Sequence, residues 1–181
     1  MSPQPVRDDL LHINTQAERA ARIVQNLLVF AREHKPQRTL VDVNDVLRST
    51  LALRAYQLRV DNIAVVTEFD AALPETIADP HQLQQVFLNL INNAHQAMTE
   101  RGGEGTLTLR TSVVNHSAEG ARDERRLLVA VSDSGVGIPA RTLNRIFDPF
   151  YTTKPVGQGT GLGLSICFGI IQEHGGRIWA E

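Results

Sequence analysis

The first apolar pattern in the chain is a stripe that repeats at alternating three- and four-residue steps. Its members are Leu10, Ile13, Ala17, Ala20, Val24, Leu27 and Ala31. This spacing predicts a helix over residues 10–32 that packs against other helices, as in a coiled coil. A single amphipathic helix lying on its own domain has the same pattern, so both arrangements stay open at this point. Pro36 ends the run, and residues 36–41 are predicted to form a linker.

A helix, a strand and a turn are predicted after this linker. Residues 42–58 place their apolar side chains on one side of a helix, whose start is capped by Asp42 or Asn44. Residues 62–69 alternate between apolar and polar side chains, which is typical of a half-buried strand. Residues 71–76 then turn the chain.

A second long helix has clear start and stop signals. Asp79 is a capping residue, Pro80 occupies the first helical position, and Gln82 is placed to complete a capping box. The helix is expected to continue to about residue 100, because the glycine pair at 102–103 stops it there.

The remaining elements complete an α/β pattern. They are predicted as two strands of a hairpin at 106–114 and 127–132, a short helix at 139–147, an irregular loop at 148–158, a helix at 161–173 and the beginning of a strand at 177–181. This succession predicts a two-layer sandwich, with helices on one face of a mixed, mostly antiparallel sheet, preceded by the long N-terminal helix.

Composition and charge narrow the classes of partner. The 181 residues are 42% hydrophobic and carry a formal net charge of -2, which suits one compact domain with an appended element. A chain so close to neutral lacks the concentrated basic surface that nucleic acid or an anionic membrane needs. We therefore expect neither as the main partner.

The single cysteine and the absence of long apolar runs exclude further classes of structure. Cys167 alone excludes an internal disulfide and a multi-cysteine metal centre, and we expect a buried, inert thiol. No apolar stretch is long enough to cross a bilayer, and the first residues lack the apolar segment of a secretory signal. A cytoplasmic location is expected for this piece, and membrane anchoring of a longer parent protein stays compatible with it.

Asn89 and Asn93 lie four residues apart on the second long helix, so their side chains share one face. Asparagine has a low propensity for helix interiors, so the presence of two asparagines at this spacing needs another reason. Caps or exposed polar residues are one interpretation. The other is a metal site, because Mg²⁺ carried by a triphosphate needs only one or two protein ligands and favours oxygen. On that interpretation Asn93 is a candidate ligand.

A carboxylate and two glycines follow the second strand of the hairpin. Asp133 ends the strand, and Gly135 and Gly137 follow within the sequence Asp-Ser-Gly-Val-Gly. A carboxylate at a strand end can accept a hydrogen bond from the exocyclic amine of adenine, while glycines let the backbone approach the base. An ordinary tight turn has the same composition, so this alternative stays open for the motif taken alone.

Glycines at alternate positions surround the start of the last predicted helix. They are Gly157, Gly159, Gly161 and Gly163, with Thr160 between two of them. Backbone N–H groups at a helix start bind anions. Neither the P-loop pattern nor the dinucleotide fingerprint is present. Lys154, which follows Thr153 in the preceding loop, can reach a terminal phosphate, and an exposed lysine with no role is the alternative.

The order of these motifs resembles that of the ATP-binding domain of two-component sensor histidine kinases, within the wider group that includes gyrase, Hsp90 and MutL. The resemblance covers about residues 41–181. Residues 89–97 are similar to the N box of that family, 133–137 to its G1 box, 147–150 to its F box and 157–163 to its G2 box. Four boxes in the family order are highly specific.

The resemblance implies roles for individual residues, with ATP and Mg²⁺ as cofactors. Asn93 matches the magnesium-binding asparagine and Asp133 the adenine-binding aspartate, and we take Asn89 and Lys154 as the candidate catalytic residues. The residues assigned to nucleotide binding are Asn93, Asp133, Gly135, Gly137, Thr153, Lys154, Gly159, Thr160, Gly161, Leu162 and Gly163.

The resemblance also implies a division of the chain. Residues 1–35 resemble the second helix of a dimerisation and phosphotransfer hairpin, and residues 42–181 resemble the catalytic domain without its last strand. No histidine has the His-Glu context of the phosphoacceptor, so autophosphorylation by this chain alone is not expected. His81 and His95 are expected to be polar helix residues.

The implied activity is transfer of the γ-phosphate of ATP to a histidine on a hairpin that is incomplete in this chain, for relay to a response regulator aspartate. In the related ATPases a glutamate at the position of Asn89 activates water, and an amide is no general base. A hydrolytic or serine-kinase member of the same fold, and a degenerate nucleotide-binding or dimerisation module, are the alternatives. The implied partners are the hairpin, a response regulator receiver domain and, in the full-length protein, a second copy of the chain.

Overall fold

The computed structural model describes residues 13, 37–116, 124–154 and 159–181. Apart from residue 13, the helix predicted over residues 10–32 lies outside the described residues, so its arrangement stays a prediction. No described helix is long and apolar enough to cross a membrane.

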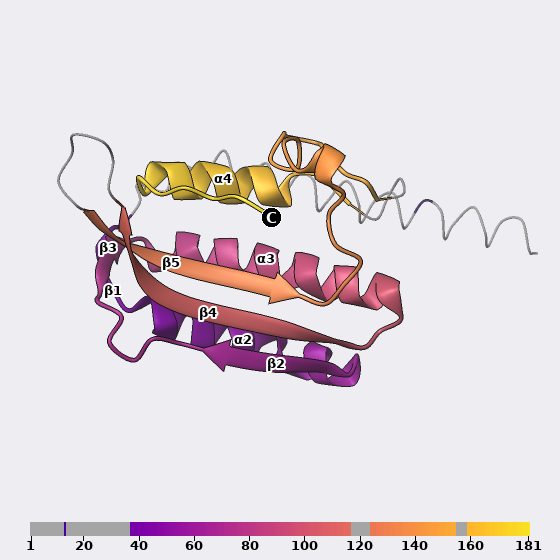
Figure 1. Ribbon diagram of the computed structural model, residues 1–181, viewed down its shortest axis with the longest axis horizontal. Coiled ribbons are helices and arrows are strands. Elements are labelled where there is room, and N and C mark those ends of the chain that lie inside the picture. The colour runs from indigo at the N-terminus through magenta and orange to yellow at the C-terminus, as the bar shows by residue number, and fades with distance from the viewer. Residues whose placement is uncertain (1–12, 14–36, 117–123, 155–158) are drawn as a thin grey trace, which may run out of the picture.

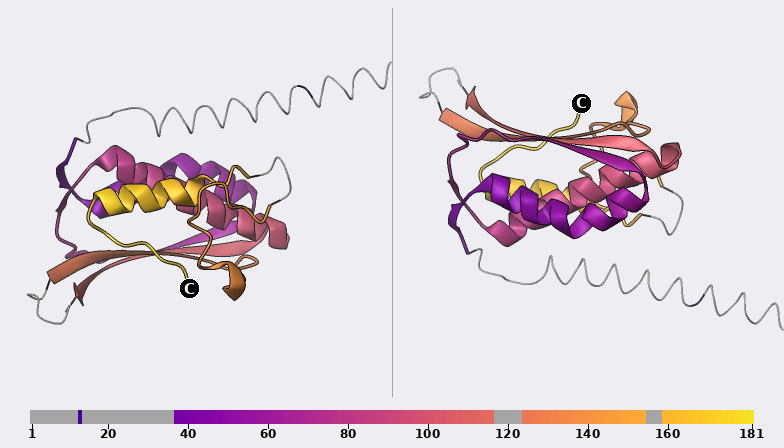
Figure 2. Two further views of the ribbon diagram at one scale, coloured as in Figure 1. Left: turned by 90° about the horizontal axis from the view of Figure 1, so that it is seen from above. Right: turned by 90° about the horizontal axis from the view of Figure 1, so that it is seen from below.

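Three helices cover one face of a three-stranded sheet (Figure 1). The strands stand in the order β2 (Ile63–Glu68), β4 (Gly105–His116) and β5 (Glu124–Asp133). The helices are α2 (Val43–Val60), α3 (Pro80–Arg101) and α4 (Gly163–Glu173). Strand β2 runs parallel to β4, and β5 runs antiparallel to it. Both views of Figure 2 place the helices on the same side of the sheet, so the predicted two-layer α/β sandwich with a mixed sheet is confirmed.

A second sheet has two strands and joins the segment before α2 to the segment before α3. Strand β1 (Thr39–Val41) pairs antiparallel with β3 (Thr76–Ala78), with Thr39 opposite Ala78. The linker predicted over residues 36–41 is therefore wrong in its second half. Strands this short carry too little alternation to be recognised locally, and each is defined by a partner far along the chain.

Hydrogen bonds among Asn44, Asp70 and Thr111 form a ring that joins the start of α2 to the sheet. Asp42 caps the helix by accepting hydrogen bonds from the N–H groups of Asn44 at 2.7 Å and Asp45 at 3.3 Å. Asn44, the other predicted cap, is buried instead. Its Nδ2 donates to the carbonyl oxygen of Asp70 at 2.9 Å, and its Oδ1 accepts from the Thr111 hydroxyl at 2.8 Å. The Thr111 hydroxyl in turn accepts from the N–H of Asp70 at 3.0 Å, which closes the ring.

The start of α3 is capped by Asp79, but no capping box forms. The Asp79 carboxylate accepts from the N–H groups of His81 at 2.9 Å and Gln82 at 3.1 Å. The Gln82 amide does not reach back and donates to Glu173 at 3.3 Å. The N–H of Asp79 instead donates to Nε2 of His174 at 3.0 Å. A side chain from the end of α4 thus takes the part predicted for Gln82.

Strands β4 and β5 form the predicted hairpin and are both longer than predicted. Their register places Leu107 opposite Asp133, and the intervening residues 117–123 lie outside the described residues. Alternate residues of β4 face the helices, whereas β2 is exposed after its first residue, Ile63. The strand predicted over 62–69 is present as β2, but it is mostly exposed rather than half-buried.

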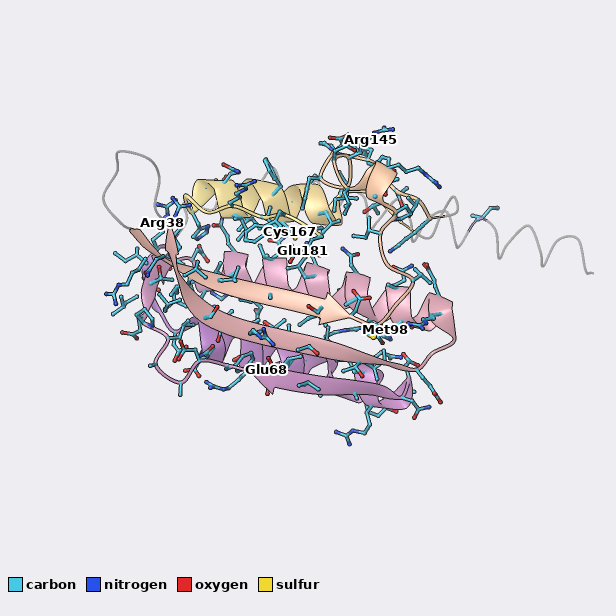
Figure 3. The ribbon with its side chains drawn as sticks, in the orientation of Figure 1. Arg38, Glu68, Met98, Arg145, Cys167 and Glu181 are labelled. Carbon is cyan, nitrogen blue, oxygen red and sulfur yellow. The ribbon has the colours of Figure 1, made fainter. Side chains whose placement is uncertain are left out.

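The core lies between the sheet and the helices. Its most deeply buried side chains are Leu47, Thr50, Leu58, Val86, Ile91, Met98, Leu107, Leu109 and Cys167. The Sγ of Cys167 lies 3.8 Å from the carbonyl oxygen of Val86, and Figure 3 shows it on the side of α4 that faces α3. Burial raises the pKa of the Cys167 thiol to about 11. The predicted buried thiol is confirmed.

Two predicted elements after β5 are wrong. The helix predicted over residues 139–147 is a single 3-10 turn, Ala140–Thr142, followed by further turns. Residues 177–181 form no strand, because no neighbouring strand pairs with them. Ile178 nevertheless packs against the core, so this segment is held by side-chain contacts.

Candidate nucleotide-binding site

One face of α3 carries the contacts that join three of the motifs. Near the middle of the helix, Nδ2 of Asn89 donates to the carbonyl oxygen of Gly163 at 3.3 Å, at the first residue of α4. Two turns later, the carbonyl oxygen of Ala97 accepts from the N–H of Val136 at 3.3 Å. Asn93 lies one turn from each. The helix thus brings the N, G1 and G2 boxes to one side.

The Asn93 side chain is half-buried and makes no hydrogen bond to any residue that the structure describes. Beside it, the buried Oδ1 of Asn92 has no hydrogen-bond partner. Buried polar atoms in proteins almost always have partners, so this part of α3 has unused capacity for a polar ligand. Amide oxygens are suitable ligands for Mg²⁺, and the donor set therefore fits the ion predicted for Asn93.

The G1 box is folded tightly against the end of α3. Oδ1 of Asp133 accepts from the N–H of Gly135 at 2.8 Å, and the side chain is otherwise exposed. A Cβ on Gly135 would lie 2.6 Å from the carbonyl carbon of Ala97, so a larger residue does not fit there. Gly137 adopts a φ of 71°, which favours glycine. An accessible carboxylate beside a close-lying backbone suits recognition of a base.

The F and G2 boxes meet through two residues with positive φ. Phe150 has a φ of 65° and Gly161 a φ of 66°. A Cβ on Gly161 would overlap the carbonyl carbon of Phe150. The Phe150 side chain is 66% exposed, so the contact is made by its backbone. A left-handed backbone is uncommon for a bulky residue and marks local strain at this junction.

Lys154 reaches from the loop after the F box back to α3. Its Nζ donates to Oε1 of Gln96, which lies one turn after Asn93. Burial lowers the pKa of the Lys154 ammonium, and the Glu100 carboxylate opposes that shift. The exposed lysine without a role is therefore the poorer interpretation. Gln96 was missed by the sequence analysis, although its spacing of three residues from Asn93 places it on the same side of the helix.

The other predicted lid residues lie around the start of α4. Oγ1 of Thr160 accepts from the N–H of Leu162 at 3.4 Å, and Gly163 begins the helix. The Leu162 side chain is buried in the core, so it anchors α4 and leaves only its backbone for a ligand. Thr153 is exposed, and its side chain makes no hydrogen bond to another described residue. Gly157 lies outside the described residues.

His95 joins α3 to the end of α2. Its Nε2 lies 2.6 Å from Oδ2 of Asp61, and its Nδ1 lies 3.3 Å from the Arg54 guanidinium. Hydrogen bonds from Gln57 and then from His95 lower the pKa of Asp61. His81 is exposed on α3. Both histidines are polar helix residues, as predicted, and His95 is engaged by its neighbours on both ring nitrogens.

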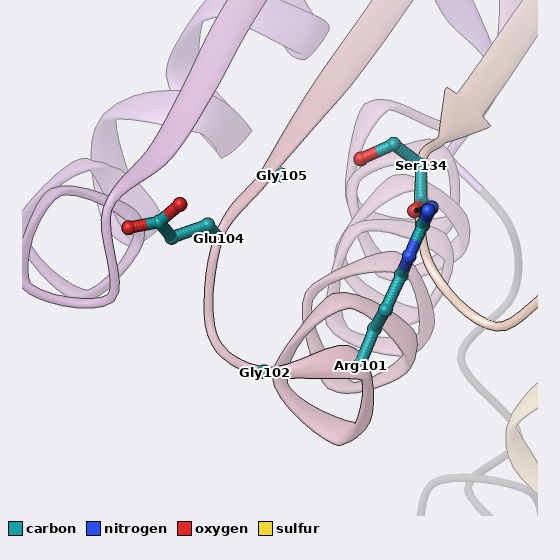
Figure 4. A pocket seen from close by; sticks show the side chains of 5 residues that line it. All are labelled: Arg101, Gly102, Glu104, Gly105 and Ser134. Atoms are coloured by element: carbon teal, nitrogen blue, oxygen red, sulfur yellow. Dashed lines mark hydrogen bonds between the residues drawn. The ribbon is translucent and has the colours of Figure 1, made fainter.

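A shallow hollow of about 490 Å³ opens beside the G1 box (Figure 4). It is lined by Arg101, Gly102, Glu104, Gly105 and Ser134. The Arg101 guanidinium donates to the carbonyl oxygen of Ser134. None of the residues assigned to nucleotide binding lines this hollow, so it is distinct from the Asn93 face of α3.

Known proteins share this sequence pattern. A family model described as Histidine kinase-, DNA gyrase B-, and HSP90-like ATPase matches residues 78–181. The chain is 39% identical to the sensor kinase CckA of Brucella abortus (strain 2308), over 98% of this chain and 19% of CckA. It is 35% identical to the sensory histidine kinase/phosphatase NtrB of Salmonella typhimurium, over 90% of this chain and 45% of NtrB. The chain thus spans less than half the length of either relative.

Solved structures share the fold. The nucleotide-free catalytic domain of the histidine kinase ThkA matches with a TM-score of 0.66 and 33% identity, covering 80% of this chain and 88% of that domain. A structure of ThkA in complex with the response regulator protein TrrA matches with a TM-score of 0.72 and 28% identity, covering 100% of this chain and 48% of ThkA.

Proposed function

The chain belongs to the family of histidine kinase-, DNA gyrase B- and HSP90-like ATPases, as a histidine kinase catalytic domain, and from this premise we propose that it binds Mg²⁺–ATP and donates the γ-phosphate to a histidine. The acceptor histidine belongs to a dimerisation hairpin, and a response regulator aspartate receives the phosphate from it. The observation that carries the proposal is Asn93, an unpaired, half-buried amide between the contacts of Asn89 and Ala97.

Asn93 would hold Mg²⁺ through its amide oxygen, and when bound the ion would offset phosphate charge. The unpaired Oδ1 of the neighbouring Asn92 supports a polar ligand at this part of the helix. Phosphates and water supply the other ligands of a magnesium ion, so one protein oxygen is enough.

Asp133 and the glycines around it would orient the base. One carboxylate oxygen of Asp133 is engaged by Gly135, which fixes the side chain and leaves the other oxygen to accept from the exocyclic amine of adenine. Guanine presents a carbonyl at the corresponding position and repels that oxygen. We therefore expect a preference for adenine.

The start of α4 and Lys154 would bind the phosphates. Thr160, Gly161 and Gly163 place backbone at the N-terminal end of α4, where N–H groups and the helix dipole favour anions. Lys154 would add a positive charge beside α3, where its ammonium donates to Gln96. Its lowered pKa is consistent with an ammonium removed from water, where its attraction to phosphate is stronger than in solvent.

Asn89 favours phosphoryl transfer over hydrolysis. Its amide nitrogen donates to Gly163, and no protonation state of an amide at neutral pH removes a proton from water. Asn89 would therefore keep α4 beside α3, and the nucleophile would come from the acceptor histidine. The contribution of the chain is positioning and charge stabilisation.

The partners follow from the same proposal. Residues 1–35 would supply one helix of the dimerisation hairpin, and a homodimer would form through the complete hairpin. The relative ThkA has been solved in complex with the response regulator protein TrrA, which supports a receiver domain as the phosphate acceptor downstream of the histidine. No membrane contact is proposed for this piece.

Calorimetry with the ATP analogue AMPPNP tests the nucleotide site. We expect binding in the presence of Mg²⁺, a loss of most of the magnesium-dependent affinity in Asn93→Ala, and a loss of the preference for adenine over guanine nucleotides in Asp133→Asn. Unchanged affinity and base preference in both variants would contradict the site.

Phosphotransfer is tested by mixing the chain and radiolabelled ATP with a separately supplied dimerisation hairpin that carries the His-Glu motif. We expect an acid-labile phosphohistidine on the hairpin and none when Asn93→Ala replaces the unaltered chain. Steady release of inorganic phosphate without labelling of the hairpin would favour the hydrolytic alternative.

A further inference from the structure

The Lys154 ammonium donates a hydrogen bond to the side-chain oxygen of Gln96. The two residues come from different elements, because Gln96 lies on α3 and Lys154 on the loop that follows the F box. Gln96 is separated by three residues from Asn93, so the ammonium is held beside the side chain that would bind the metal.

The rest of Lys154 is fixed from the loop side. Its N–H donates to Oγ1 of Thr152 at 3.2 Å. Gly159 packs against its stem, since a Cβ on Gly159 would lie 3.2 Å from Cδ of Lys154 and 2.7 Å from Oγ1 of Thr152. The stem and the ammonium are therefore positioned by separate contacts, and among the described residues Gln96 accepts the hydrogen bond that holds the charged end at α3.

The chemistry of Gln96 suits a holder that leaves the charge available. A lysine ammonium has three donors, and the neutral amide oxygen of Gln96 uses one of them. A carboxylate at this position would neutralise the ammonium and repel a phosphate. The Glu100 carboxylate lies one turn further along α3 and acts on Lys154 electrostatically, without a hydrogen bond between the two residues.

These contacts lead to one assignment. The geometry points to Gln96 as a positioning residue that sets the selectivity of the site for a nucleoside triphosphate over a diphosphate, by holding the Lys154 ammonium where the terminal phosphate would lie. The inference rests on the proposed nucleotide site. It assigns a role to Gln96, which lies within the N box but is not among the residues that the resemblance assigns to nucleotide binding.

The test is calorimetric titration of the full chain with AMPPNP and with ADP, both in excess Mg²⁺. Gln96→Leu removes the acceptor, and we expect the affinity for AMPPNP to fall about tenfold, as for the loss of one charge-assisted hydrogen bond, with the ADP affinity unchanged. Gln96→Glu should reduce the AMPPNP affinity further. Lys154→Met should reproduce the Gln96→Leu effect, and the double variant should add nothing to it, because both act through the same ammonium.

The matched control is Gln84→Leu, the same substitution at a half-buried glutamine on another side of α3. It should leave the ratio of AMPPNP to ADP affinities unchanged. A purely structural role for Gln96 would instead lower both affinities and the melting temperature together.

The outcomes separate the inference from the function on which it rests. If the unaltered chain binds both nucleotides and Gln96→Leu leaves their affinity ratio unchanged, or if the double variant shows additive losses, the role of Gln96 is rejected and the nucleotide site stands. If the unaltered chain binds neither nucleotide, the nucleotide site itself is rejected and the role of Gln96 with it.

Discussion

The left-handed backbone of Gly161 lies directly on the left-handed backbone of Phe150. This contact holds the end of the F box beside the segment that enters α4. The side-chain amide of Asn89 donates to the carbonyl oxygen of the first residue of α4, so the start of that helix is held by Asn89 as well as by the Phe150 backbone.

Gly161→Ala should weaken this junction and the nucleotide affinity together. The left-handed conformation costs a residue with a side chain about 1–2 kcal/mol, and the new methyl group would overlap backbone that has little room to move. We expect a free energy of unfolding lower by about 2 kcal/mol and weaker binding of AMPPNP. Chemical denaturation and calorimetry measure the two effects.

Gly169→Ala is the matched control for that prediction. Gly169 lies within α4 and has no atom within 4 Å of an added Cβ. The substitution should raise the free energy of unfolding by about 1 kcal/mol, because alanine favours a helix interior more than glycine. Equal effects of the two substitutions would contradict the role of the Gly161 contact.

The cap of α3 should make stability depend on pH. Burial alone would raise the pKa of Asp79, but the N–H groups of Gln82, Gln37 and His81 outweigh it and hold the pKa below its ordinary value of 3.8. The charged carboxylate therefore stabilises the fold above about pH 4, and this contribution is lost as the pH falls through the lowered pKa.

Two substitutions separate the charge of Asp79 from its cap. Asp79→Ala should lower the free energy of unfolding by about 1–2 kcal/mol near neutral pH, and the deficit should shrink below about pH 4. Asp79→Asn retains a capping oxygen and should cost less, without the acid dependence. Denaturant titrations across this pH range measure both, and a deficit for Asp79→Ala that is constant with pH would contradict the assignment.

The polar ring around Asn44 should behave as a unit. Asn44→Leu leaves a buried Thr111 hydroxyl without one of its partners, and we expect a loss of about 2–3 kcal/mol in the free energy of unfolding. Adding Thr111→Val removes the stranded hydroxyl. The double variant should then be less destabilised than the sum of the two single variants, and strict additivity would argue against the ring.

Cys167 should be unreactive in the folded chain. Because burial raises the pKa of its thiol to about 11, almost no thiolate exists near pH 8, and the sulfur is covered by α3. A chromogenic disulfide reagent should therefore label it only on the timescale of unfolding, and at full rate in denaturant. The same shift means that this thiol favours the folded state up to about pH 9, and the contribution is lost as the pH rises through 11. Rapid labelling under native conditions would contradict the burial.

The sequence predicted the parts of the fold that are defined locally. Asp79 and Pro80 start α3, the glycines at 102–103 end it, and the alternation over 106–114 lies within β4. The strands β1 and β3 were missed because each exists only through the other. The hydrogen bond from the N–H of Asp79 to His174, where Gln82 was predicted as the acceptor, was missed for the same reason. Asp79 and His174 are adjacent only after α4 has packed.

The candidate site shows the same division. The boxes predicted Asn93, Asp133 and the glycines as site residues, because each motif is a short run of sequence. The contacts that position those motifs, from Gln96 to Lys154 and from Ala97 to Val136, join segments that are distant in the chain. Leu162 was assigned to the ligand from its box, but its side chain is required by the core.

Residues of α3 contact Gly163, Lys154 and Val136, so the spacing along this helix sets how those contacts are arranged. Inserting a single residue between Asn89 and Ala97 would rotate the later contacts by about 100° around the helix axis and shift them by about 1.5 Å along it. Gln96 and Ala97 would then no longer meet Lys154 and Val136 while Asn89 meets Gly163. We therefore expect an insertion or a deletion in this stretch of α3 to disturb the site more than a substitution that keeps the spacing.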